Sequence, residues 1–342
     1  MAPQKRWLRQ PLSWQRGGAV ALTVLLVVAA ATLVLDSGED REVASVADRL
    51  TSRGRDPVDL VEETGRAARI VLLSDVHDRA GPKRVAAEAI RRLAEGPGLD
   101  AVVLEVPASE QAVIDAYLAS PDEDASMLMG RPAAVREAGG VPRAYLDIYR
   151  AVREVNESVG AARRIRVIAA DIEDWPPAEG LSPEEVADRY AGRAEHMLAR
   201  MDDQILSIMP DARMLVFVDG YLALRRGYGE LQFAGGPPRR VTWLGDLLRT
   251  RSGSDARTIL ADVGGPLGGV TERIPRYRGT RLHRPLGRAV DGTTAVRITD
   301  AFAAVPDPVL ELDSPGLQLE ILPAGYTLDE VANGYIYFQG GR

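Results

Sequence analysis

Acidic side chains follow four short apolar runs of this chain, and a histidine accompanies the first of them. The runs cover residues 70–73, 101–104, 167–170 and 214–218, and the acids that follow them are Asp75, Glu105, Asp171 and Asp219. His77 comes two residues after Asp75. Carboxylates and an imidazole can activate water as general bases, and both can bind a divalent metal. These residues therefore predict a hydrolytic or metal-binding site.

The four runs have the length of buried strands, and helical segments separate them. Between the first two, residues 82–95 repeat apolar side chains at helical spacing, and we expect Lys83 on the other faces of that helix. This βαβ pattern predicts that the first two strands are parallel and that Glu105 lies beside the loop that carries His77. Open α/β sheets bind ligands at the carboxyl ends of their strands. We therefore predict an α/β fold with a mainly parallel sheet flanked by helices.

Each candidate also has a structural interpretation. His77 could belong to a turn, and Glu105 could form a salt bridge with an arginine. Asp171 and Asp219 could end turns, since Asp219 precedes a glycine. A helix that starts at the Ser182 cap and could run as far as Met209 carries Arg193. Arg193 could reach the sheet edge as an anion clamp, or it could be solvated.

The composition excludes several kinds of site. The chain has 342 residues, of which 46% are hydrophobic and 27% charged, as in a globular protein. It has no cysteine, so disulfides, thiol nucleophiles and zinc–thiolate sites are excluded, and its three histidines argue against a site built mainly from imidazoles. The net charge is −7, and residues 1–35 carry +4, which leaves −11 on the remainder. Such an acidic body argues against nucleic-acid binding.

Residues 18–35 form an uncharged and almost wholly apolar stretch that is just long enough to span a bilayer. Basic residues precede this stretch and acidic residues follow it, which predicts a single-pass anchor with a cytoplasmic amino terminus and an extracytoplasmic body. The alternative is a cleaved signal peptide, with a small-residue cut site at 29–31. We favour the anchor because the apolar run continues past that site.

These patterns divide the chain into four parts. We expect a basic cytoplasmic segment, the anchor, a linker with short helices, and one α/β domain whose portion after residue 225 is rich in glycine and proline. Their respective ranges are 1–17, 18–35, 36–66 and 67–342.

Several motifs together resemble the erythromycin-esterase and ChaN/Tiki-like superfamily. Residues 71–78 resemble its strand ending in G-E-x-H, with Ser74-Asp75 in place of G-E, and Glu105 resembles the glutamate that ends its next strand. Asp171, Arg193 to Met197 and residues 333–338 resemble its third-strand aspartate, its R-x-x-x-M helix and its closing strand. The later G-x-x-H strand end departs from the family pattern, because Tyr221 stands where the histidine is expected.

The resemblance implies a hydrolase that acts on a small-molecule or peptide substrate. His77 would be general base or metal ligand, Glu105 would orient His77 or the water, and Asp75 would replace the family glutamate. The resemblance also implies further catalytic residues, and it implies ligands for a divalent metal or for haem as cofactor. The catalytic set is His77, Glu105, Asp75, Asp171 and Arg193; the metal set is His77, Glu105 and Asp219; and the haem ligands are Tyr221 and His77.

Two other functions stay open. One is a non-enzymatic surface protein that binds haem or a metal, and the other is a catalytically degenerate scaffold of the cell envelope. A calcineurin-like phosphoesterase is excluded, because its two-metal site needs several histidine motifs that this chain does not contain.

Overall fold

The computed structural model divides the chain into two units, Met1–Ser45 and Val46–Arg342, and all elements described below belong to the second. Residues 1–43, which include the predicted anchor, lie outside the description, as do His77 and Asp78. The described residues are 44–76, 79–120, 128, 142–173, 175, 180–233, 236–263, 276–280, 286, 290–298, 310–313, 317–322 and 326–339. Among these residues no helix is both long and apolar enough to cross a bilayer.

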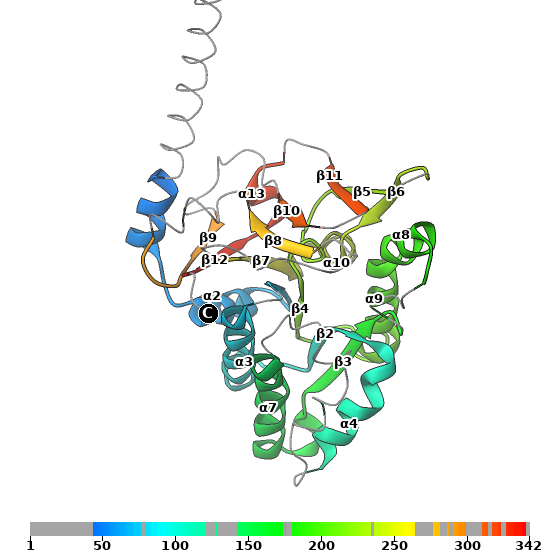
Figure 1. Ribbon diagram of the computed structural model, residues 1–342. Helices are drawn as coiled ribbons and strands as arrows, with labels where there is room; N and C mark the ends of the chain where they lie inside the picture. Colours follow the sequence, from blue (N-terminus) through cyan, green and yellow to red (C-terminus); the bar gives the residue numbers. More distant parts are fainter. Residues whose placement is uncertain are drawn as a thin grey trace, which may run out of the picture. The chain divides into compact units, whose positions relative to one another are not determined.

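Strands and helices alternate through the first two thirds of the described chain (Figure 1). The helices are α2 (Pro57–Ala67), α3 (Ala80–Glu95), α4 (Gln111–Ala119), α7 (Pro142–Ser158), α8 (Pro183–Ala191), α9 (Arg193–Met201), α10 (Leu244–Ser252) and α13 (Leu328–Val331). Short helical turns are η1 (Ala108–Glu110), η2 (Ala161–Arg163), η3 (Asp202–Leu206) and η4 (Gly253–Asp255). The strands are β1 (Ile70–Asp75), β2 (Ala101–Pro107), β3 (Arg166–Asp171), β4 (Met214–Asp219), β5 (Tyr228–Phe233), β6 (Arg239–Thr242), β7 (Ala256–Val263), β8 (Arg276–Thr280), β9 (Thr294–Arg297), β10 (Leu310–Asp313), β11 (Leu317–Leu322) and β12 (Gly334–Phe338).

A seven-stranded sheet in the order β3-β2-β4-β1-β7-β12-β9 forms the centre of the fold. All its pairings are parallel except that of β9 with β12. The four apolar runs form its central strands, because a strand covered on both faces by helices is apolar along its whole length. The predicted mainly parallel α/β fold is confirmed.

One part of the predicted strand arrangement is wrong. β1 and β2 are parallel, but β4 lies between them and pairs with both. The crossover through α3 therefore spans two strand spacings, about 10 Å. Sequence patterns within one βαβ unit cannot reveal a strand that is inserted from more than a hundred residues further along the chain.

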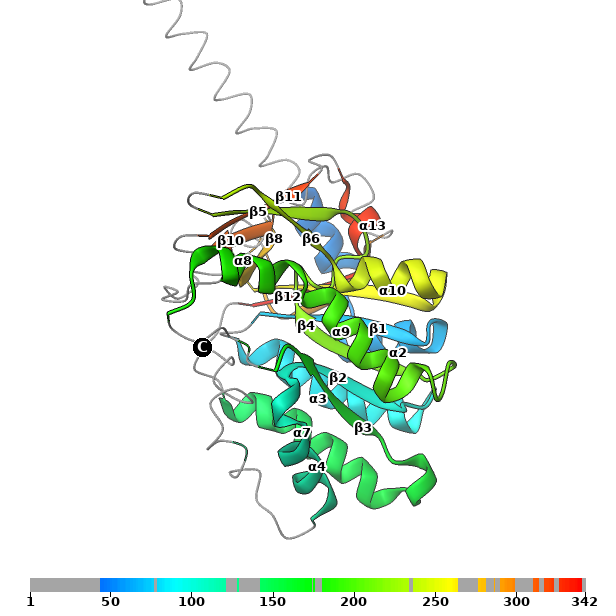
Figure 2. The same ribbon diagram turned by 90° about the vertical axis from the view of Figure 1, so that its right-hand side faces the viewer.

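Helices cover both faces of this sheet (Figures 1 and 2). Helices α2, α3 and α7 pack against one another on one face, and α9 and α10 pack together on the other. The antiparallel strands β11-β5-β6 and β10-β8 form two smaller sheets, and α8 contacts β5 and β6 (Figure 2).

Local sequence signals explain where the site-bearing helices begin. Ser182 caps α8 through a capping box with Glu185, as predicted. The single helix expected from Ser182 to Met209 is instead interrupted at Gly192, where α9 begins with Arg193. Glycine favours such a break because it has low helix propensity.

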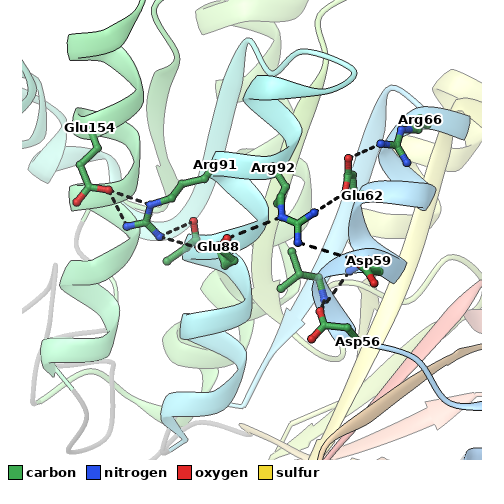
Figure 3. Close-up of polar contacts among 10 residues, drawn as sticks. Asp56, Asp59, Glu62, Arg66, Glu88, Arg91, Arg92 and Glu154 are labelled. Carbon is green, nitrogen blue, oxygen red and sulfur yellow. Dashed lines mark hydrogen bonds and ion pairs between the residues drawn. The ribbon is translucent and has the colours of Figure 1, made fainter.

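Ion pairs connect the exposed sides of α2, α3 and α7 (Figure 3). Arg91 pairs with Glu154 of α7 at 2.7 Å, and Arg92 pairs with Glu62 of α2 at 3.4 Å. Arg91, Arg92 and Glu154 are partly solvated, although Glu62 is nearly buried, so the Arg91–Glu154 pair contributes about 0–1 kcal/mol. The buried apolar residues beneath them supply most of the stability.

We therefore expect very different costs for two alanine substitutions. Leu72→Ala, at a side chain with 0% exposure in β1, should lower the free energy of unfolding by about 2–5 kcal/mol. Arg91→Ala should lower it by at most about 1 kcal/mol. Urea unfolding of both variants measures the difference, and similar costs would contradict this account.

Candidate functional site at the carboxyl edge of the sheet

Five adjacent parallel strands each carry an acid at or near their carboxyl ends. In sheet order from β3 to β7 these are Asp171, Glu105, Asp219, Asp75 and Asp262, and none is more than 6% exposed. The register places Asp75 of β1 opposite Asp219 of β4. The sequence analysis missed Asp262, although it follows a short apolar run at 259–261 in the same way as the other four acids.

The Arg193 guanidinium joins the carboxylates of two of these strands, β3 and β2, and the hydroxyl of Tyr221, which follows β4. Its Nε donates to Asp171 Oδ1 at 2.8 Å, and its Nη2 donates to Asp171 Oδ2 and to Glu105 Oε1, the latter at 2.5 Å. Its Nη1 donates to the Tyr221 hydroxyl at 2.6 Å. The second Glu105 oxygen, Oε2, accepts from the Asp219 backbone N–H at 2.5 Å. Glu105 is therefore fixed at both oxygens.

This network has consequences for the predicted roles. Glu105 forms the salt bridge with an arginine that was its structural alternative, so its place at the edge is compatible with either interpretation. Arg193 is 2% exposed and uses four of the five N–H donors of a guanidinium. It is neither solvated nor available as an open anion clamp.

Aromatic rings enclose the guanidinium. Its carbon lies 4.1 Å from the centre of the Trp175 ring, and Tyr190 stacks on Tyr221 at 5.5 Å. Trp243 contacts the other side of Tyr221 edge-on at 5.9 Å. The rings exclude water, which strengthens the charged hydrogen bonds that they surround.

Burial and the ion pairs shift the pKa values of Arg193 and Asp171 in opposite directions. Burial by itself would lower the pKa of Arg193, but Asp171 and Glu105 raise it well above its usual value, so Arg193 stays a cation. Burial raises the pKa of Asp171, and Arg193 opposes that change. Burial also raises the pKa of Tyr221, which stays a neutral phenol.

Asp75 takes part in a second buried ion pair. Lys83 Nζ donates to Asp75 Oδ1 at 2.7 Å and to the Val76 carbonyl at 2.9 Å, and the lysine is 0% exposed. The expectation that Lys83 lies off the apolar face of its helix is wrong. It stands three and seven residues before Ala86 and Ile90, which is the spacing of one helix face.

The structure brings most of the predicted site residues together. Glu105, Asp171, Asp219, Arg193 and Tyr221 form one hydrogen-bonded cluster. Asp75 adjoins it through the β1–β4 register, while His77 lies outside the described residues. The prediction that the strand of Glu105 neighbours β1 is wrong, because β4 separates the two strands and its Asp219 stands between them.

The described part of the cluster fits neither a metal nor haem. No three His, Cys, Asp or Glu side chains of the described residues lie close enough to hold a metal ion. Glu105 already accepts from Arg193 and from Asp219, so the predicted metal set would have to break these bonds. Tyr221 is 0% exposed, and its raised pKa opposes the phenolate that would ligate iron.

A further hydrogen-bonded pair extends the edge beyond β1. The Tyr335 hydroxyl of β12 donates to Asp262 Oδ2 at 2.5 Å, and Ser74 Oγ accepts from the Ala261 N–H at 2.6 Å. Ser74 therefore ties the end of β1 to β7, a role that the glycine of the family motif has no side chain to perform.

Solved structures share this fold at low sequence identity. A mutant of the erythromycin esterase EreC in its open conformation matches with a TM-score of 0.53 at 13% identity, over 82% of this chain and 93% of that one. A succinoglycan biosynthesis protein gives 0.55 at 10%, over 86% and 96% of the two chains, and a protein from Bacillus cereus gives 0.51 at 14%, over 87% and 97%. No family model and no curated protein matches the chain. The chain thus has the fold of erythromycin esterase, as the resemblance implies.

Arg193→Met tests the cluster through its pH dependence. Without the cation the pKa of Asp171 rises further above its value in the unfolded chain. The folded protein then loses stability as the pH rises from the unfolded pKa of this carboxyl to its folded pKa, because the folded state holds the proton more tightly. We expect a loss of about 3–5 kcal/mol near neutral pH and a smaller loss near about pH 4.5.

Urea unfolding at several pH values measures this dependence. Arg91→Met is the matched control, since it removes a partly solvated arginine of an ion pair. A loss for Arg193→Met that is independent of pH would contradict the proposed balance.

Proposed function

We propose that this protein is a hydrolase that activates water at the carboxyl edge of the sheet, with His77 as the general base. The supporting observation is the fixed position of Glu105, whose two oxygens accept from Arg193 and from the Asp219 backbone. A carboxylate that is held in place before substrate arrives can orient an imidazole or a water without reorganisation. The esterase fold raises the expectation of such a reaction by analogy.

The proposal requires His77 to turn from the end of β1 toward this carboxylate. Two residues span at most about 7 Å, so His77 stays near Asp75 at the end of β1. Asp75 pairs in register with Asp219, about 5 Å away on the adjacent strand. Glu105 accepts from the Asp219 N–H. In this proposal a water or one substrate group bridges His77 and Glu105.

The other residues of the site act as positioning residues. Arg193 holds Glu105 and Asp171, and Lys83 holds Asp75. In this proposal His77 takes the proton of the attacking water, and Glu105 stabilises the resulting imidazolium. The substrate is a small-molecule ester or a peptide bond, since both are cleaved by an activated water.

His77→Ala should lower turnover of a reactive ester by about 10²–10⁴-fold, because a positioned general base contributes that much. A panel of aryl esters and short peptides identifies the substrate. His196→Ala on α9 is the matched control and should leave turnover unchanged. Equal turnover of His77→Ala and the unchanged chain would contradict the catalytic role.

A catalytically degenerate envelope scaffold is the second candidate. The observation that favours it is the engagement of both Glu105 and Arg193 within the protein, where they also serve stability. A scaffold predicts no turnover across the panel for the full chain. The haem-binding alternative lacks such an observation, since Tyr221 is buried, and haemin titration without a Soret shift would dismiss it.

We further propose that residues 18–35 anchor the protein in the cell membrane with its body outside the cytoplasm. The support is the length of the apolar run and the basic residues before it. The full chain should stay in the membrane pellet after an alkaline wash, and sequencing of its amino terminus should find residues ahead of Gly18. A mature end near Ala31 would instead favour a cleaved signal peptide.

A further inference from the structure

A cavity of about 570 Å³ lies at the amino ends of the strands, away from the site described above. Its lining includes Ala256 at the start of β7 and Asn333 just before β12. Ala256 pairs with Ile70, and β1 runs about 16 Å from there to Asp75. The cavity therefore lies at the opposite end of the sheet, and its volume is typical of small-molecule sites.

The lining of this cavity is strongly basic, although the chain as a whole is acidic. Among the described residues of its lining the carboxylate is Glu63, which also pairs with Arg55 and lies 3.6 Å from Arg297. The arginines that line the cavity are Arg225, Arg249, Arg257 and Arg297. The described lining thus has four guanidinium groups and one carboxylate, which is an excess of positive charge.

Two of these arginines have donors to offer a ligand. Arg225 is partly buried, and its Nε has no hydrogen-bond partner among the described residues. Arg257 has no ion pair with any described carboxylate. Arg249 differs, because it donates to the Arg225 carbonyl at 2.7 Å and to Asp246 at 2.8 Å. Burial lowers the pKa of Arg225, and the nearby arginines lower it further.

A neutral donor adds to this arrangement. Asn333 Oδ1 accepts from the Thr258 N–H at 3.0 Å, so the oxygen of its amide is occupied and the NH₂ group stays available to an acceptor. A binding site with guanidinium groups and a neutral amide donor suits a ligand that carries several acceptor oxygens and a negative charge. Guanidinium groups bind phosphate through paired, charge-assisted hydrogen bonds.

We propose that this cavity binds a small molecule bearing a phosphate group, with Arg225 and Arg257 as its principal contacts. A bound dianion neutralises the excess charge of the lining and relieves the repulsion between the arginines. The inference does not depend on the proposed hydrolase, because it rests on different residues at the other end of the sheet.

Isothermal titration of the full chain in detergent with inorganic pyrophosphate tests the proposal. We expect a Kd in roughly the micromolar to millimolar range, weakening as salt is added. The double variant Arg225→Gln/Arg257→Gln should raise the Kd at least about tenfold. The matched control Arg91→Gln/Arg92→Gln removes the same charge outside the cavity and should leave the Kd unchanged.

A second titration with glycerol 3-phosphate separates two sources of the phosphate. Tighter binding of this compound points to a lipid headgroup, and tighter binding of pyrophosphate points to a soluble ligand; both support the site. Absence of binding by both compounds, or an equal loss in the control variant, would overturn it. If the double variant does not fold, Arg257→Gln alone carries the test, and ester turnover reports separately on the other site.

Discussion

The Arg193 guanidinium is the charge on which the carboxyl edge of this fold depends. It is buried together with Asp171 and Glu105, and leaving any of the three without its partner in the interior would be costly. Arg193 comes from α9, while its partners end β3 and β2, and Tyr221 follows β4. One side chain thereby fixes the relative positions of three strands and a helix.

The sequence patterns predicted where the strands lie in the chain, but not the order of all of them in the sheet. β1 to β4 were expected within three residues of their observed bounds, because four apolar runs between helices leave little freedom in a sheet covered on both faces. That β4 lies between β1 and β2 depends on packing between distant segments, and no local period records it.

For the candidate site, too, the residues could be predicted from the sequence and their contacts could not. Four acids at strand ends could be identified because they interrupt or end apolar runs, and these four lie at one edge together with Asp262, which was missed. Their pairing could not be identified, since the choice of Arg193 for Asp171 and Glu105, and of Lys83 for Asp75, is made in three dimensions. The burial of Lys83 could have been predicted, because its helical spacing to Ala86 and Ile90 places it on their apolar face.

The central place of β1 in the sheet has a consequence for how the polypeptide is made. Both neighbours of β1 are synthesised much later, since Ile70 pairs with Met214 on one side and with Ala256 on the other. Contacts of such long sequence separation form slowly. The nascent chain therefore carries this apolar strand without its complete set of partners for more than half of translation, and unpaired apolar strands of this kind are prone to aggregate.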